Sequence, residues 1–447
     1  MKITPNTSSL TLRRTFWFWL PLAVMWLVMS AEQPSITAVV SRLPEATENL
    51  AAFGLTFSLA LIVESPVIML LTAATALATH RQAFRRLLAF SGMLALVETV
   101  LHVVLALTPL YGVVVRSLIG APGELVETSR IAFLLMTPWT GMIAFRRMFE
   151  GVMIRWGQPQ RVTVVVALRL ATTALVLVAG FVAGRWPGAY VGALALSAGV
   201  TVGALAAFLL SRSSVAEHLG PPRAGDAPLG WGELLRFYVP LVLTALITMV
   251  GGPIFSFGLS HAALPLESLA VWPVVTSLLF IGRSGGMAYQ EVGVALLRDE
   301  SGRPVLRRFA WLLAAASTAG FALLAFTPAA SWWYQRVSGL APRLVDLALV
   351  PTLLVVPVPG LTVAISWLRA VLVHARRTGP VSGAVALNMA TLLALMLMLP
   401  RVTTLPGAVQ ATIGLTISLG VESVFLAWAV RRAKGAARGA EVAADRT

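Results

Sequence analysis

One stretch of about 45 residues occurs twice in this chain. Residues 21–65 read PLAVMWLVMSAEQPSITAVVSRLPEATENLAAFGLTFSLALIVES, and residues 240–284 read PLVLTALITMVGGPIFSFGLSHAALPLESLAVWPVVTSLLFIGRS. Adding 219 to each number of the first copy aligns identical residues at 21, 22, 27, 34, 48, 50, 51, 58, 59, 62 and 65. One register held over this length indicates a duplicated unit.

The same register continues far beyond these two copies. Thr108-Pro109 aligns with Thr327-Pro328, and Pro187-Gly188-Ala189 aligns with Pro406-Gly407-Ala408. The duplication therefore covers most of each half of the chain, and the sequence predicts a protein of two similar halves.

Composition places those halves in a membrane. Hydrophobic residues make up 57% of the 447 residues, charged residues make up 12%, and the mean hydropathy is +0.83. A helix needs roughly 20 apolar residues to span the bilayer core. The sequence predicts an all-α polytopic protein with about twelve spans, at residues 16–40, 50–77, 87–107, 131–145, 162–182, 190–210, 237–259, 269–297, 309–326, 347–368, 381–399 and 408–430.

Six spans in each half bring both ends of a half to the same side of the membrane, which predicts a parallel repeat. We expect six-helix lobes at 1–210 and 233–433, joined by a polar, Pro- and Gly-containing linker at 211–232. The Ala-, Gly- and Arg-rich tail at 434–447 is expected to be disordered. We expect the chain to work as a monomer.

The distribution of positive charge predicts the orientation. Most of the 34 Lys and Arg fall at the termini and in the loops on the same side. This asymmetry favours cytoplasmic N- and C-termini in a multi-pass protein of the cell inner (plasma) membrane. The net charge of +15 is then explained by loop-end anchors near anionic lipid, and no basic face for nucleic acid is expected.

The first helix of each half is interrupted at equivalent positions, by Glu32-Gln33-Pro34 and by Gly251-Gly252-Pro253. Proline removes one backbone hydrogen bond and kinks a helix, and glycine loosens it. In a bilayer, freed carbonyls are tolerated only against protein or a water-filled cavity. Pro34, Gly251, Gly252 and Pro253 are therefore predicted gating residues, and a packing kink is the alternative.

Ionisable residues inside the spans are candidates for function, because burying a charge in a bilayer costs about 3 kcal/mol or more. Arg169 lies within the fifth span, and its repeat mate is the polar Asn388. The guanidinium group suits carboxylates and phosphates, so Arg169 and Asn388 are predicted to bind an anionic substrate. The alternative for Arg169 is a salt bridge to Glu32 or Glu64.

Glu64 and Arg283 occupy equivalent positions in the second and eighth spans. They are expected either to pair across the interface between the lobes, or to serve their own lobes, with Arg283 binding substrate and Glu64 binding protons. A static packing pair is the third interpretation. Gln33 and Gln290 are expected to add polar contacts to the substrate.

Proton or cation coupling requires a buried carboxylate, and Glu32 is the first candidate because it lies beside freed backbone carbonyls. The alternative is that Glu32 caps the broken helix. Glu98 and His102 share one helical face and are predicted to relay protons, with a packing role as the alternative. Glu422 is a further candidate.

Several short stretches resemble a known family. They are Glu32-Gln33-Pro34, Glu48-Asn49-Leu50-Ala51, Phe53-Gly54-Leu55, Ser58-Leu59, Arg130-Ile131-Ala132-Phe133-Leu134, Pro357-Val358-Pro359 and Gly420-Val421-Glu422-Ser423. They resemble the progressive ankylosis (Ank) family, within the MATE-like multidrug/oligosaccharidyl-lipid/polysaccharide (MOP) exporter superfamily. Glu150-Gly151 with Arg155, Gly157, Gln158 and Pro159 also resembles a loop of MATE exporters. The resemblance implies a two-lobed, twelve-helix secondary exporter of citrate, nucleotide triphosphate or pyrophosphate.

We therefore expect a secondary active transporter that exports a small organic or phosphorylated anion by rocking of two lobes. The alternatives are a MATE-type exporter of cationic drugs coupled to H⁺ or Na⁺ through Glu32 and Glu64, a flippase for lipid-linked oligosaccharides, and a membrane scaffold without transport. The sequence has no phosphate-binding loop, no helical His-Glu-x-x-His motif and no cysteine. We accordingly expect no enzymatic activity, metal or cofactor, and partners limited to substrate, a coupling H⁺ or Na⁺, and the lipid bilayer.

Overall fold

The computed structural model describes residues 10–221, 228–297, 302–375, 377 and 379–444, with side chains up to residue 433. In this part of the chain the protein is all-helical. The first half contains α1 (Leu12–Ser30), α2 (Glu32–Val40), α3 (Ala46–Ile68), α4 (Leu70–Leu77), α5 (Arg81–Leu107), α6 (Leu110–Gly112), η1 (Val113–Leu118), α7 (Leu125–Leu135), α8 (Thr137–Arg155), α9 (Pro159–Ala183) and α10 (Gly188–His218).

The second half repeats this order, except that the single helix α13 stands in place of α3 and α4. It contains α11 (Trp231–Met249), α12 (Gly251–His261), α13 (Pro265–Leu296), α14 (Arg303–Phe326), α15 (Pro328–Trp332), η3 (Trp333–Val337), α16 (Pro342–Leu354), α17 (Val358–His374), α18 (Gly379–Val402) and α19 (Gly407–Ala444). Most of the predicted tail thus lies on α19, and residues 445–447 lie outside the described part.

Backbone features confirm the duplication in the predicted register of 219. The π-helical turns η1 and η3 occupy equivalent positions. Two residues in the left-handed conformation, Glu45 (φ 51°) and Leu264 (φ 53°), are also 219 apart, as are Gly120 (φ 78°) and Gly339 (φ 72°). Features this uncommon recur at matching places because the two halves share one backbone path.

Eleven described helical segments are long and apolar enough to cross a membrane, which indicates a multi-pass membrane protein. The sequence predicted about twelve. The missing one is the predicted span 131–145, which falls on α7 and α8 and is helical but not among the eleven. This segment does not need an apolar surface, because α8 packs against α4, α5 and α10, and it buries Arg146 and Glu150 among them.

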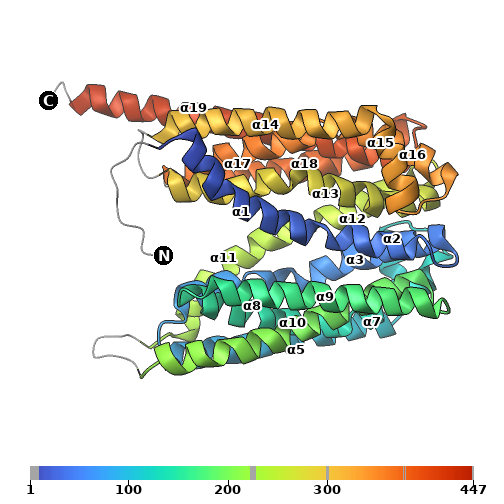
Figure 1. Ribbon diagram of the computed structural model, residues 1–447, viewed down its shortest axis with the longest axis horizontal. Helices are drawn as coiled ribbons and strands as arrows, with labels where there is room; N and C mark the ends of the chain where they lie inside the picture. The colour runs from blue at the N-terminus through green and yellow to red at the C-terminus, as the bar shows by residue number, and fades with distance from the viewer. Residues whose placement is uncertain (1–9, 222–227, 298–301, 376, 378, 445–447) are drawn as a thin grey trace.

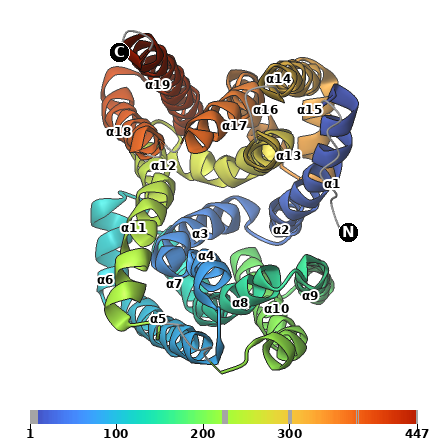
Figure 2. The same cartoon turned by 90° about the vertical axis from the view of Figure 1, so that its left-hand side faces the viewer.

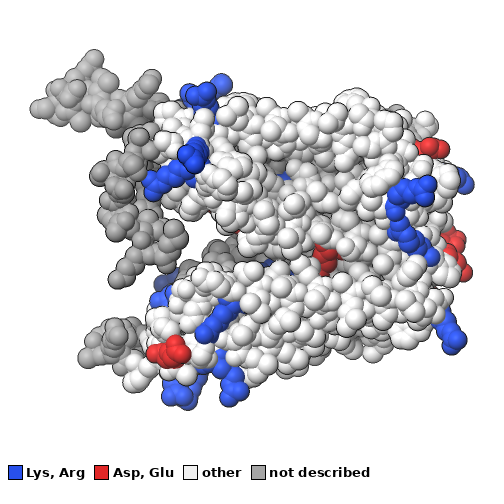
Figure 3. Space-filling view, in the orientation of Figure 1, with Lys and Arg blue, Asp and Glu red and all other residues white. Residues whose placement is uncertain are grey.

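The two halves form two groups of helices that separate towards the end at which both termini lie (Figure 1). Charged side chains gather at the two ends of the molecule, and the band between them is largely uncharged except in the hollow between the groups (Figure 3). An uncharged band of this kind fits the apolar core of a bilayer, because charged side chains exposed to that core are costly.

The first helix of each half crosses from one group to the other. Helix α1 packs against α13 and α14 of the second half, whereas α2 packs against α9 and α10 of its own half and also contacts α13. In the same way α11 packs against α3, and α12 packs against α18 and α19. Figure 2 shows the pairs α1–α2 and α11–α12 on opposite sides of the space between the groups. Helices α1 and α11 thus pack mainly against the half of the chain to which they do not belong by sequence.

The crossing occurs at the two predicted interruptions. Helix α1 ends at Ser30 and α11 ends at Met249, and a new helix starts two residues later in each case. Pro34 and Pro253 have no N–H to donate to the carbonyls of Ser30 and Met249, so each helix is interrupted there and changes direction.

At the end away from the termini the two groups are in contact. Arg42 donates hydrogen bonds to the carbonyl oxygens of Arg336 (2.5 Å) and Val337 (3.0 Å), and the Ser41 hydroxyl donates to the carbonyl of Ser338. At the equivalent place, 219 residues on from Arg42, the His261 ring lies against Gly120. The space between the groups is therefore closed at this end by two pseudosymmetric contacts.

Candidate functional site

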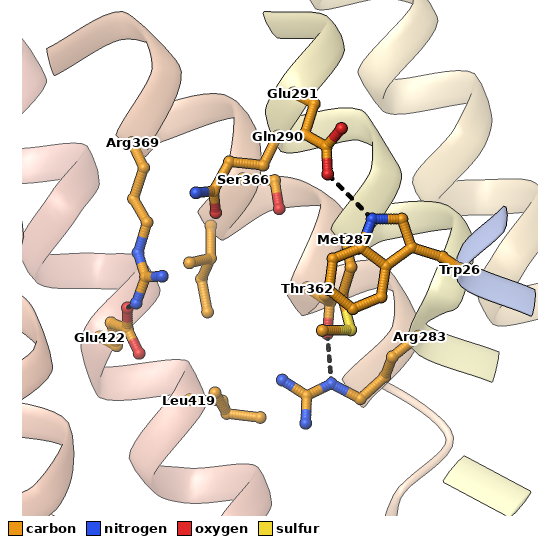
Figure 4. A pocket seen from close by; sticks show the side chains of 11 residues that line it. Trp26, Arg283, Met287, Gln290, Glu291, Thr362, Ser366, Arg369, Leu419 and Glu422 are labelled. Carbon is orange, nitrogen blue, oxygen red and sulfur yellow. Dashed lines mark hydrogen bonds and ion pairs between the residues drawn. The ribbon is translucent and has the colours of Figure 1, made fainter. Parts of the chain in front are cut away.

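A cavity of about 290 Å³ lies between helices of the second half and α1 (Figure 4). Helices α1, α13, α17 and α19 line it. Its lining residues are Trp26, Arg283, Met287, Gln290, Glu291, Thr362, Ile365, Ser366, Arg369, Leu419 and Glu422. Seven of its eleven lining residues are polar or charged, and charged residues are unusual within the apolar part of a membrane protein.

Arg283 lies near the middle of α13 and is half-buried. Its Nε donates a hydrogen bond of 2.9 Å to Oγ1 of Thr362. Among the described residues Arg283 forms no ion pair, and its terminal nitrogens point into the cavity (Figure 4). A guanidinium group in this state presents several N–H donors to a ligand.

The second cationic residue of the cavity is neutralised. Arg369 donates a hydrogen bond to one carboxylate oxygen of Glu422, and Asn388 Nδ2 donates to the other at 2.7 Å. Glu422 and Asn388 are buried, and Asn388 does not line the cavity. Asn388 thus holds Glu422 rather than facing a substrate, and Glu422 serves as the counter-ion of Arg369.

The first half contains a separate cluster of charges. Arg169 donates to both carboxylate oxygens of Glu32, at 2.7 and 2.6 Å, and Thr173 donates to the same carboxylate at 3.3 Å. The Glu150 carboxylate forms ion pairs with Arg146 at 3.0 Å and with Arg147 at 3.6 Å. Of the interpretations offered for Arg169, the structure shows the salt bridge to Glu32.

Glu64 is buried in the first half, and its Oε2 has no hydrogen-bond partner in the described structure. The structure shows no ion pair between Glu64 and Arg283. Glu64 and Arg283 therefore do not pair across the interface in this conformation. Each of the two side chains faces the charges of its own half.

The repeat exchanges the sign of charge between the two halves. Glu64 in the first half corresponds to Arg283 in the second, and Glu150 corresponds to Arg369. Gly203 corresponds to Glu422, and a Cβ atom at Gly203 would lie 3.2 Å from Arg146 Cδ and 3.5 Å from Arg169 Cβ. In the first half, arginine side chains thus fill the space next to Gly203, where the second half has Glu422.

Glu98 and His102 lie on one face of α5 and are both buried. Neither carboxylate oxygen of Glu98 has a hydrogen-bond partner among the described residues. His102 Nε2 donates to the carbonyl oxygen of Phe133 at 2.6 Å, so its Nδ1 accepts from the Thr140 hydroxyl at 2.8 Å. Both ring nitrogens of His102 therefore have hydrogen-bond partners, and Glu98 is not one of them.

The residues of the interruptions lie at the contact between the groups. A Cβ atom at Gly252 would lie 3.2 Å from Ser58 Cβ on α3, and the hydroxyls of Ser58 and Ser256 are 3.2 Å apart. Gly252 thus allows α12 to approach α3 closely. The Gln33 side chain makes no described hydrogen bond and does not line the cavity, whereas Gln290 does line it.

Sequence reasoning missed Arg369, Thr362, Ser366 and Trp26 as site residues. Arg369 lies near the end of a span, where an arginine looks like a loop-end anchor. Its repeat mate Glu150 offered a signal, because a charge at both equivalent positions is unexpected for two unrelated loop ends.

No protein-family model matches the sequence, and no curated protein matches it. Solved structures with a similar fold are transporters. An inward-facing MATE family multidrug resistance transporter of the MOP superfamily is 16% identical, with a TM-score of 0.65 over 94% of this chain and 99% of that chain. The lipid II flippase MurJ in an inward closed conformation is 9% identical, with a TM-score of 0.67 over 92% of this chain and 87% of that chain.

A third similar structure is a MOP superfamily transporter from Pyrococcus furiosus, described as having a binding pocket of reverse polarity that suggests a different function. It is 14% identical, with a TM-score of 0.62 over 97% of this chain and 100% of that chain. At these identities the likeness is one of fold, and this chain has the fold of MATE and MurJ transporters.

Proposed function

We propose that the chain is a secondary active transporter of the MOP type that exports a small organic or phosphorylated anion by alternating access. The fold supports a transporter rather than an enzyme, since the proteins that share it are named as transporters or flippases. The crossing helices α1–α2 and α11–α12 connect the two groups in a way that lets one group rock against the other.

The observation that carries the anionic substrate is the state of Arg283. In the first-half cluster each arginine has a carboxylate partner, since Arg169 pairs with Glu32, and Arg146 and Arg147 both pair with Glu150. In the inner part of the second-half cavity Glu422 neutralises Arg369, and Arg283 is left as an uncompensated cation. A ligand carboxylate or phosphate at Arg283 would supply the missing charge.

The size of the cavity fits a small ligand. Its volume of about 290 Å³ is at the lower end of small-molecule sites, which typically hold about 300–1,000 Å³. Citrate, pyrophosphate and a nucleotide triphosphate, the substrates implied by the resemblance to the Ank family, are the first ligands to test. The cationic-drug alternative has less support, since Arg169 neutralises its proposed site at Glu32.

We propose that both termini are cytoplasmic and that the space between the groups opens to the cytoplasm in this conformation. The support is the excess of Lys and Arg on the side of the termini. Coupling to H⁺ is assigned to Glu98 and Glu64, whose unpaired buried carboxyl groups are the most expensive to keep charged. One chain contains both groups, and we propose that it acts as a monomer.

The test is thermal stability of the purified protein with citrate, ATP, pyrophosphate or a lipophilic cation. A ligand at 100 times its Kd stabilises the folded state by about 2.7 kcal/mol. We expect an anion to raise the Tm of the native protein and of a control variant, Arg116→Met, in which an exposed arginine is lost. The Tm rise should vanish in Arg283→Met. Stabilisation by the cation alone, unchanged in Arg283→Met, would contradict the proposal.

A further inference from the structure

The mouth of the second-half cavity carries a charge opposite to that of its interior. Glu291 lies two helical turns beyond Arg283 on α13, and both line the cavity. The positions 283, 287, 290 and 291 follow the spacing of one helical face. At about 1.5 Å per residue, the backbones of Arg283 and Glu291 are roughly 12 Å apart along the helix axis.

The Glu291 carboxylate can still accept hydrogen bonds and pair with a cation of the ligand. It is exposed towards the opening, and its only hydrogen bond in the described structure comes from Trp26 Nε1 on α1, at 3.0 Å. No ion pair of the described residues involves it. One carboxylate oxygen therefore accepts from a neutral donor, and the negative charge has no cationic partner.

The indole of Trp26 adds a second feature that favours a cation. Figure 4 shows the ring beside the cavity, between Glu291 and Arg283. The hydrogen bond to Glu291 fixes the orientation of the ring, and an indole face attracts ammonium groups. Glu291 and Trp26 thus form a cation-attracting end, while Arg283 with Thr362 forms an anion-attracting end.

The four charged groups around the cavity leave two uncompensated charges of opposite sign. Arg369 and Glu422 neutralise one another, which leaves Arg283 positive in the interior and Glu291 negative at the mouth. We infer that the transported organic or phosphorylated acid also carries an ammonium group and is therefore a zwitterion, with its carboxylate or phosphate bound at Arg283 and its ammonium group bound between Glu291 and Trp26. This inference rests on the proposed function, because it uses the same cavity and names the class of its substrate.

The test uses four compounds of equal chain length and the purified full-length protein. They are 6-aminohexanoate, which carries both charges, adipate, which carries two carboxylates, hexanoate, which carries one, and hexylamine, which carries only the ammonium group. Apparent Kd values come from the rise of Tm with ligand concentration. We expect 6-aminohexanoate to bind roughly three- to tenfold more tightly than hexanoate, the range of a cation–π contact with a partly exposed ion pair. Adipate should bind more weakly than hexanoate, because its second carboxylate would meet Glu291.

Two variants separate the two ends of the site. In Glu291→Gln the preference for 6-aminohexanoate over hexanoate should disappear, while hexanoate still binds. In Arg283→Met both acids should lose binding. Glu124→Gln, which removes an exposed carboxylate at the far end of the molecule, is the matched control and should keep the preference.

Each adverse outcome has a distinct meaning. If adipate binds at least as tightly as 6-aminohexanoate, or if the preference survives in Glu291→Gln, the zwitterion inference is wrong and the anion site at Arg283 stands. If binding of all the acids is independent of Arg283, the proposed function is wrong as well. An absence of stabilisation by any of the four compounds would overturn the zwitterion inference, and the proposed function would fall as well only if citrate, ATP and pyrophosphate also gave no stabilisation.

Discussion

Arg169 on α9 binds both carboxylate oxygens of Glu32, the first residue of α2, at 2.7 and 2.6 Å. The pair joins the fifth predicted span to the interruption of the first, across 137 positions of sequence. Both side chains are about nine-tenths buried. One guanidinium nitrogen, Nη1, makes both contacts, and a pair with this burial holds the start of α2 against α9 of its own half.

Removing one partner of this pair should destabilise the protein more than removing both. A buried charge left without its partner costs about 3–5 kcal/mol. We expect Arg169→Met to lower the Tm strongly, and the double variant Arg169→Met with Glu32→Gln to recover a large part of the loss. Thermal unfolding in detergent measures both. A double variant less stable than either single one would mean that the two residues act independently.

The closed end should loosen when Gly339 is replaced by alanine. Gly339 has φ 72°, and a Cβ atom there would lie 2.7 Å from Arg42 Nη1. Left-handed backbone at a non-glycine residue costs about 1–3 kcal/mol. We expect Gly339→Ala to displace Arg42 and to increase labelling of a cysteine placed at Ser338, which is buried.

The natural absence of cysteine makes this labelling specific, since the introduced thiol is then the sole target. The control is Gly123→Ala, where an added Cβ atom meets nothing within 4 Å. Equal labelling rates in the two alanine variants would show that the contact of Arg42 with Gly339 does not hold the groups together.

Locking the closed end should stop transport. The hydroxyl of Ser41 binds the carbonyl of Ser338 across the two groups. In the double variant Ser41→Cys with Ser338→Cys, we expect a short thiol-specific crosslinker to reduce substrate release from proteoliposomes to background. Each single cysteine variant, treated identically, should keep its activity. Full transport by a crosslinked protein would contradict alternating access through separation at this end.

We expect that accumulation of substrate driven by a pH gradient requires Glu98, and that exchange of substrate across the membrane does not. Its two carboxylate oxygens are buried without partners, and a glutamine of the same shape carries no charge that burial would penalise. We expect Glu98→Gln to fold with a stability within about 1 kcal/mol of the native protein, since it replaces an unpaired carboxyl group by a neutral one. Accumulation driven by a pH gradient should be lost, and exchange of labelled for unlabelled substrate should remain.

The control for this experiment is Glu124→Gln, which alters an exposed carboxylate. If Glu98→Gln retains gradient-driven accumulation, Glu98 has a packing role and Glu64 becomes the remaining unpaired carboxyl group to examine.

The duplication, the helical membrane fold and the places at which the first helix of each half is interrupted can all be predicted from the sequence. These features are local or periodic: a register of 219 is visible without coordinates, and a proline removes its hydrogen bond wherever the chain goes. The ionisable residues Arg169, Glu64 and Arg283 were also visible, because an ionisable residue stands out within an apolar run.

Which charges are neutralised, and which line the cavity without an ionic partner, depends on the packing of helices that are distant in the chain. Arg169 pairs with Glu32, 137 residues away in the chain, and Arg369 pairs with Glu422, 53 residues away. The packing that brings them together depends on α1 crossing to α13, a relation between surfaces that no local pattern encodes. Arg283 and Glu291 remain uncompensated for the same reason, since electrostatic pairing follows distance in space rather than position in the chain.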